Sequence, residues 1–209
     1  MLRKTVLYKY LRKQHADLLI KRGKLRIGTL YGYRDIEKHG TKVGDADEGK
    51  KSLYMKVGPE QWTADNQPEF TKGSIKIANG ISVHMENVSF QKSESSTDYY
   101  VYCATEEFDE NALKDFGYDA CVVIEKPDRF FAAISRTLRH KCTFEGVFHC
   151  QYVPRKVEHN KDHGIHPAII KDPSYKDQKE VRALWKPFKR SISPLVIDCR
   201  DATKYCRML

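Results

Sequence analysis

The sequence predicts a single α+β domain whose sheets are mixed but mostly antiparallel, with roughly three or four helices. About eight short segments are rich in β-branched and aromatic residues. They are interleaved unevenly with the helical segments, whereas doubly wound sheets alternate strand and helix regularly. No repeat, low-complexity segment or linker rich in Pro, Gly and Ser divides the 209 residues. We therefore expect one domain over residues 1–209.

The first elements are expected to be a strand, a helix and a second strand. Residues 5–10 are rich in β-formers, and residues 24–30 alternate apolar and polar side chains. Between these two strands, residues 14–21 have helical spacing, and Gly23 is a typical residue for ending a helix.

A β-hairpin is expected in residues 74–85, where apolar residues alternate on both sides of Asn79 and Gly80. An Asn-Gly pair is the preferred two-residue connection between antiparallel strands. The alternating residues are Ile75, Ile77, Ile81, Val83 and Met85. This hairpin is interpreted as an insertion at about residues 69–90.

Strands and helices continue in the second half of the chain. Residues 99–105 and 120–125 are predicted to be buried strands, separated by a short helix that Asp109 caps and Gly117 ends. A longer helix is expected to open at Pro127. Its inner face is expected to carry Phe130, Phe131, Ile134 and Leu138, and the last strands to be 144–153, 180–185 and 194–199.

The net charge of +9 is unevenly distributed. Residues 1–26 carry nine Lys and Arg against one acid, and residues 121–209 carry eighteen against ten. Residues 27–120 carry ten Lys and Arg against seventeen acids. Pairing between the ends and the middle is one interpretation. The other is a basic face for nucleic acid or a phosphate-bearing ligand, in a module that binds nucleic acid or a partner without catalysis.

Several common classes are excluded by missing patterns. The chain has no P-loop, Rossmann, nucleophile-elbow or H-E-x-x-H motif. No apolar run approaches the roughly 20 residues that span a bilayer, so no membrane partner is expected. The charged opening is unlike a signal peptide. Six cysteines without such a signal indicate reduced thiols and a cytoplasmic location.

No metal site is predicted, although two segments carry residues of the right type. His159 and His163 have a spacing found in zinc sites, but no Cys pair accompanies them. Asp45, Asp47 and Glu48 lie in an acidic segment that lacks the ligand spacing of an EF-hand. A metal-dependent nuclease that uses these three acids stays open as a further alternative.

Two polar stretches are candidates for a site. Residues 31–50 form a glycine-containing polar loop that begins with Tyr31, Tyr33 and Arg34, which offer aromatic faces and a guanidinium for phosphate. Near the C-terminus, three polar side chains alternate and would share one face of a strand, either as a surface stripe or towards a cleft. They are Gln178, Glu180 and Arg182.

Three segments together resemble an uncharacterised bacterial family that occurs in mobile and phage-defence loci. These segments are residues 7–10 with the following helix and 23–26, residues 102–106 with the strand at 120–125, and residues 178–182. The last of these resembles a late E-x-R strand of that family. The chain departs from the family at residues 33–37, where an N-D-P-x-E-like segment is usual.

The opening strand, helix and strand also resemble ADP-ribosyltransferases, which bind NAD between two small sheets. The resemblance implies Glu180 as the catalytic residue that contacts the nicotinamide ribose, and Gln178 as the residue that orients the acceptor. It also implies a toxin or phage-defence effector that modifies nucleic acid or protein, with a cognate antitoxin or defence-system protein as partner. The residues expected to bind NAD are Tyr8, Tyr10, Arg26, Tyr31, Tyr33, Arg34 and Arg182.

Overall fold

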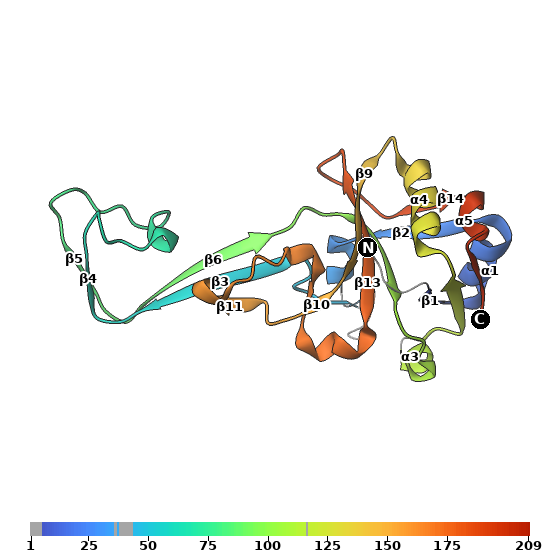
Figure 1. The fold of residues 1–209 in the computed structure, drawn as a ribbon, viewed down its shortest axis with the longest axis horizontal. Helices are drawn as coiled ribbons and strands as arrows, with labels where there is room; N and C mark the ends of the chain where they lie inside the picture. Colours follow the sequence, from blue (N-terminus) through green and yellow to red (C-terminus); the bar gives the residue numbers. More distant parts are fainter. Residues whose placement is uncertain (1–5, 36, 38–43, 116) are drawn as a thin grey trace.

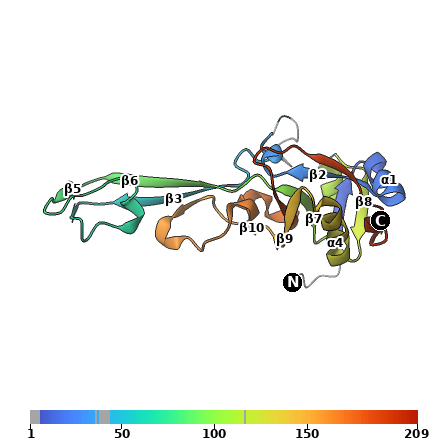
Figure 2. The same cartoon turned by 90° about the horizontal axis from the view of Figure 1, so that it is seen from above.

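The structure, a computed structural model, describes residues 6–35, 37, 44–115 and 117–209. Figure 1 shows a body of sheet and helices from which a long arm of strands projects, and the arm also projects in the perpendicular view of Figure 2. The expected α+β class with mostly antiparallel sheets is confirmed, since all pairings in the central sheet are antiparallel.

An eight-stranded sheet forms the body, and β7 lies at its branch point. One edge of β7 pairs along its length with β13, which in turn pairs with β9. The other edge pairs with β2 near Val101 and with β1 at Thr105. The strands are β1 (Leu7–Leu11), β2 (Lys24–Thr29), β7 (Tyr100–Thr105), β8 (Ala120–Ile124), β9 (Cys142–His149), β13 (Glu180–Pro187), β14 (Leu195–Asp198) and β15 (Cys206–Met208).

The sheet is therefore forked. One branch continues from β1 to β8 and β15, and the other continues from β2 to β14. In the part of the chain that the structure describes, residues 102–104 of β7 have no strand partner on the forked edge. The two branches thus leave a gap beside the middle of β7.

Helices cover one face of this sheet and share one buried apolar cluster with it. The helix expected at 14–21 is confirmed as α1 (Lys13–Arg22), and Gly23 ends it with a φ of 69°. The helix expected at Pro127 is α4 (Pro127–Leu138), and its four predicted inner residues are buried. The shorter helices are α3 (Glu110–Asp115) and α5 (Arg200–Thr203).

The arm is a separate extension with its own apolar cluster of Val57, Trp62, Met85 and Phe90. Its shaft pairs β3 with β6 antiparallel and β3 with β11 in parallel, and its tip pairs β4 with β5. These strands are β3 (Lys50–Val57), β4 (Glu60–Trp62), β5 (Val83–Met85), β6 (Val88–Ser95) and β11 (Lys156–Glu158).

The predicted hairpin at Asn79 and Gly80 is wrong in its pairing. A turn forms there, in which the Ile81 N–H donates to the Ala78 carbonyl at 3.1 Å, but residues 74–82 contain no strand. β5 pairs instead with β4. The physical reason is that the isoleucines at 75 and 77 pack against the arm's apolar cluster instead of across a hairpin, while Ile81 is 53% exposed.

Other expected elements are confirmed with small changes. The strand expected at 144–153 is divided into two strands. The first is β9, which ends at His149, and the second is β10 (Gln151–Tyr152), which pairs separately with β12 (Ile170–Lys171). Asp109 caps α3 by accepting from the Asn111 N–H at 2.8 Å. Of the predicted loop, residues 36 and 38–43 lie outside the described residues. The 3₁₀ turns are η1 (Tyr31–Arg34), η2 (Glu69–Thr71), η3 (His159–Lys161), η4 (Pro167–Ile169) and η5 (Pro173–Gln178).

Two negative findings apply to the described residues. No helix among them is both long enough and apolar enough to cross a membrane. All six cysteines lie in the described part of the chain, and none of them forms a disulfide.

Candidate functional site

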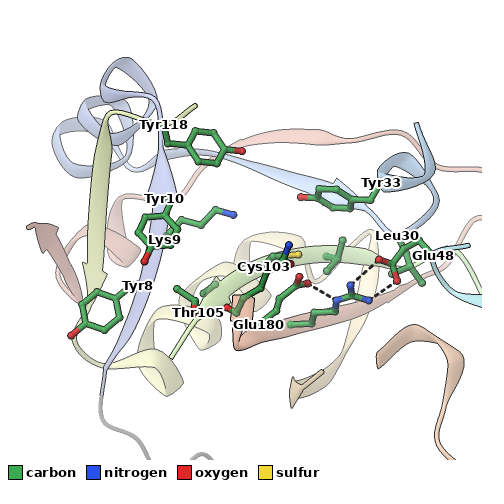
Figure 3. A pocket seen from close by; sticks show the side chains of 14 residues that line it. Tyr8, Lys9, Tyr10, Leu30, Tyr33, Glu48, Cys103, Thr105, Tyr118 and Glu180 are labelled. Carbon is green, nitrogen blue, oxygen red and sulfur yellow. Dashed lines mark hydrogen bonds and ion pairs between the residues drawn. The ribbon is translucent and has the colours of Figure 1, made fainter. Parts of the chain in front are cut away.

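A cleft opens at the gap between the two branches of the sheet, and we call it the fork cleft. Its volume is about 100 Å³, of the same order as the roughly 150 Å³ cavities that hold one aromatic ring. Figure 3 shows side chains of both branches turned towards it. The lining residues are Tyr8, Lys9, Tyr10, Leu30, Tyr33, Glu48, Val101, Cys103, Ala104, Thr105, Tyr118, Gln178, Glu180 and Arg182.

Strand alternation brings the polar side chains of β13 to the cleft. Glu180 pairs with Thr105 and Arg182 with Cys103, and all four residues line the cleft. The intervening Val181 packs into the core on the opposite face. The interpretation of this stripe as solvent-exposed is therefore wrong, since Glu180 is 9% and Arg182 2% exposed.

A buried ion-pair network holds the carboxylate of Glu180. The Arg182 Nε donates to Glu180 Oε1 at 2.6 Å, and the Lys171 Nζ donates to Oε2 at 2.5 Å. Lys171 also donates to the side-chain oxygen of Gln178. Burial would raise the pKa of Glu180, but the charges of Arg182 and Lys171 outweigh it, so this pKa lies well below its usual value. The carboxylate is therefore ionised at neutral pH.

The acidic segment completes this network. Arg182 donates to both carboxylate oxygens of Glu48, from Nη1 at 2.7 Å and from Nη2 at 2.8 Å. Arg155 pairs with Asp45, and Lys50 pairs with Asp47 at 3.1 Å. The three acids of the nuclease alternative are thus all paired with basic side chains, and Arg155 Nη2 also lies 3.9 Å from Glu48 Oε1. Within residues 6–35, 37, 44–115 and 117–209, no group of three or more His, Cys, Asp or Glu side chains is placed to bind a metal ion.

Two tyrosines form the upper part of the cleft in Figure 3, with their hydroxyls turned towards each other. The ring of Tyr33 lies over Gly28, where a Cβ atom would come within 3.1 Å of it. Glycine at this position therefore lets the ring lie close to β2. Burial raises the pKa of both Tyr33 and Tyr118. Both phenols are therefore protonated at neutral pH and able to donate hydrogen bonds.

Lys9 reaches the cleft from β1, on the other side of the gap. Its Nζ lies 5.0 Å from the centroid of the Tyr102 ring. In the described part of the chain it makes no ion pair and no side-chain hydrogen bond. Burial lowers the pKa of Lys9, and Arg26 adds to this effect, whereas Cys103 and Glu180 oppose it. Lys9 is not among the site residues expected from the sequence, although a lysine within a short strand of β-formers is an available signal.

The structure brings most of the predicted site residues together. Tyr8, Tyr10, Tyr33, Gln178, Glu180 and Arg182 line the fork cleft. Arg26 is exposed on β2 and does not line the cleft, but its charge acts on Lys9 and Tyr33.

Tyr31 and Arg34 do not line the cleft, because they have other partners. The Arg34 guanidinium lies 3.5 Å from the centroid of the Tyr31 ring, and its Nε donates to the Glu48 carbonyl at 2.7 Å. The Tyr31 hydroxyl donates to the Ser96 carbonyl at 2.5 Å. These two residues fix the loop around Glu48 and do not face the cleft.

No protein-family model, no curated protein and no solved structure matches this chain. The geometry and chemistry of the fork cleft are therefore the basis for assigning a function.

Proposed function

We propose that the chain is an ADP-ribosyltransferase that transfers ADP-ribose from NAD to a nucleic-acid or protein acceptor, as an effector of the toxin or phage-defence type. The supporting observation is that the ionised Glu180 carboxylate and the rings of Tyr33 and Tyr118 meet at one cleft, formed where the sheet divides. The two tyrosines come from parts of the chain that lie far from the late glutamate.

The residues present fit part of NAD. A volume of about 100 Å³ suits the nicotinamide ring but not the whole dinucleotide. The faces of Tyr33 and Tyr118 are suited to stacking on that ring. Arg26 is exposed on β2, outside the lining of the cleft, and would hold the pyrophosphate. The rest of the dinucleotide would lie outside the cleft, along the face that carries Arg26.

Glu180 would stabilise positive charge at the reacting ribose. NAD supplies the ADP-ribosyl group and a neutral nicotinamide leaving group. The bond to that leaving group breaks with positive charge developing on the sugar, and a fixed carboxylate stabilises such charge without reorganising. Arg182 and Lys171 fix the two oxygens of Glu180. Gln178, whose side-chain oxygen accepts from Lys171, is suited to orient the acceptor.

The test is transfer of labelled ADP-ribose from NAD to nucleic acid and to protein acceptors. We expect Glu180→Gln to lower the transfer rate at least ~100-fold, as for other losses of transition-state charge stabilisation. Glu125→Gln removes an exposed ion pair with Arg207 and is the matched control. Because Glu180 also belongs to the buried network, Tyr118→Ala is a second variant that leaves this network unchanged. Equal labelling by wild type and both cleft variants, or no labelling of any acceptor, contradicts the proposal.

A second candidate is nucleic-acid binding without catalysis, and the pairing of β2 with β14 favours it. This pairing brings the two basic ends of the chain together. Gly23 packs against the backbone of Arg200, so the exposed Arg22, Lys24 and Arg200 lie close to one another.

The test is the salt dependence of duplex-DNA binding. The function is supported if the logarithm of the affinity falls by about 0.9 per log unit of salt for each contacted phosphate. We expect Lys24→Glu to reduce that slope, while Lys126→Glu leaves it unchanged. Absent binding or salt-independent binding contradicts the second candidate.

A further inference from the structure

Among the residues that line the fork cleft, Lys9 has no acidic side chain within ion-pair distance in the described part of the chain. Glu48 and Glu180 balance Arg182 and Lys171, and Asp45 balances Arg155. Lys9 is additional to these pairs. The Glu180 carboxylate acts on it electrostatically, but both oxygens of that carboxylate already accept hydrogen bonds from other cations.

The position of Lys9 directs its amine into the cleft. β1 meets β7 only at Tyr8, so Lys9 is the first residue of β1 beyond that contact. Figure 3 shows its nitrogen turned towards the space that the Tyr33 and Tyr118 hydroxyls also face. The sulfur of Cys103 and the carboxylate of Glu180 border the same space from below.

This environment disfavours the charged form of the amine. An ammonium loses hydration on burial, and a second cation nearby adds repulsion, which are the two ways in which proteins activate a lysine as a nucleophile. Both act on Lys9, which is half-buried with a desolvated amine and is repelled by Arg26, while Cys103 and Glu180 oppose the effect. The remaining neighbours are the phenols of Tyr33, Tyr102 and Tyr118 and the thiol of Cys103, and burial raises the pKa of each of these groups. They therefore stay uncharged at neutral pH.

We infer that Lys9 is a nucleophilic amine that forms an imine with a small neutral aldehyde or ketone bound in the fork cleft. A neutral carbonyl compound fits better than an anion because the Glu180 carboxylate borders the same space. The volume of about 100 Å³ limits the compound to about the size of one ring. The open-chain form of a sugar belongs to this class. This activity is distinct from ADP-ribosyl transfer and needs no NAD.

The step balances without any oxidant or reductant. The lone pair of the Lys9 nitrogen attacks the carbonyl carbon while the π electrons move to the oxygen. That oxygen receives a hydrogen bond from the Tyr33 or Tyr118 hydroxyl. A proton passes from nitrogen to oxygen, which gives a carbinolamine. The hydroxyl group and the second proton of the nitrogen then leave together as water, and the C=N bond forms.

The experiment measures adducts with glycolaldehyde in the presence of sodium cyanoborohydride, without NAD, at pH 7. Cyanoborohydride reduces the imine to a stable secondary amine, and peptide mass spectrometry locates it. We expect Lys9 to be modified at least tenfold faster than the exposed Lys126 of the same protein. Lys9→Arg keeps the charge but cannot form the imine, so the fast adduct is lost. Lys126→Arg is the matched control and retains the fast adduct.

Three outcomes overturn the inference. Modification of Lys9 at the rate of Lys126, or more slowly, shows that the amine is not activated. A fast adduct that persists in Lys9→Arg places the reactive group elsewhere. Binding of inorganic phosphate that is lost in Lys9→Met, together with slow modification of Lys9, assigns this residue to anion binding. Failure of ADP-ribosyl transfer has no bearing on these results, because NAD is absent.

Discussion

Arg182 holds Glu48, 134 residues away in the sequence, through two parallel hydrogen bonds of 2.7 and 2.8 Å. Both side chains are buried, at 2% and 1% exposure. The same guanidinium donates to Glu180 at 2.6 Å and to the Ala168 carbonyl at 2.7 Å. One arginine therefore joins β13 to the acidic segment and to η4, and it fixes the floor of the fork cleft.

Replacing this arginine by leucine is expected to destabilise the protein by about 3–5 kcal/mol, because two buried carboxylates lose their shared partner. The free energy of unfolding in urea measures this. Arg207→Leu removes an exposed pair with Glu125 at 2.8 Å and is expected to cost less than ~1 kcal/mol. Similar losses for the two variants would mean that the buried network does not contribute more than a surface pair.

Stability is expected to fall in acid because of Glu180. The pKa of this carboxyl is depressed in the folded state relative to its ordinary value of 4.5. Its contribution is therefore present above pH 4.5 and is lost as the pH falls below that value towards the folded-state pKa. Urea unfolding between pH 6 and 3 checks this. The Glu180→Gln variant should be less stable at pH 6 and should lose stability less steeply below about pH 4.5. Identical slopes for both proteins would contradict the prediction.

Gly49 is expected to be intolerant of alanine. Its φ is 70°, and a Cβ atom there would lie 2.8 Å from Ser96 Oγ and 2.9 Å from Leu30 Cδ2. Gly80 is the matched control, since its φ is 79° and no atom lies within 4 Å of its Cβ position. Both variants bear the left-handed backbone cost of about 1–2 kcal/mol. Only Gly49→Ala adds an overlap of about 1–3 kcal/mol. Thermal unfolding compares the two, and equal melting temperatures would refute the expected difference.

Trp62→Ala is expected to loosen the arm while the body keeps its fold. The arm's apolar cluster is separate from the two clusters of the body, and Trp62 stacks on Phe90 with ring centroids 5.7 Å apart. Loss of a buried Trp costs about 3–5 kcal/mol, which here falls on a small local unit. Limited trypsin digestion should cleave after Lys72 or Lys76 at least tenfold faster than in wild type. Loss of the body's near-ultraviolet circular dichroism at the same time would show that arm and body unfold together.

Local sequence patterns were sufficient to predict the helices and strands that pack one face against the core. The strand, helix and strand before residue 30 follow from alternation, helical spacing and the stop at Gly23. α4 follows from Pro127 and from the spacing of its aromatic residues. In each case the signal lies within a few neighbouring residues, and the core packs against the face that this signal indicates.

An insertion was expected at about residues 69–90, but the shaft strands β3 and β6 of the arm were not predicted because they carry weak patterns. In β3 the buried position 51 is a lysine, paired with Asp162 at 2.5 Å, so the apolar alternation is interrupted. β6 is largely polar and exposed. A strand that is exposed on both faces lacks the alternation of apolar and polar residues that marks a half-buried strand. The hairpin prediction failed for a related reason, since Ile75 and Ile77 are partly buried against the arm's cluster instead of packing across a strand pair.

The composition of the candidate site was only partly predictable. The period of a strand placed Gln178, Glu180 and Arg182 on one face. This was correct for Glu180 and Arg182 but wrong for Gln178, which ends the 3₁₀ turn η5 and lies outside β13. The burial of Glu180 and Arg182 depends on Glu48 and Lys171, which no pattern around residue 180 reveals. Lys9 became a candidate only through the long-range pairing of β1 with β7, which directs its side chain into the gap. Tyr31 and Arg34 have the side chains expected of a ligand site, but they bind each other.

The fork has a consequence for the order in which the protein matures during synthesis. Its two branches begin with residues from the first thirty of the chain, whereas the floor needs Glu180 and Arg182. A growing polypeptide therefore lacks the cleft until β13 has left the ribosome, even after α1, β7 and α4 have emerged. Pairings this distant in sequence form slowly compared with local ones. Whatever chemistry the cleft performs thus requires residues 180–182, and a chain that is released before β13 has been made lacks the floor of the cleft.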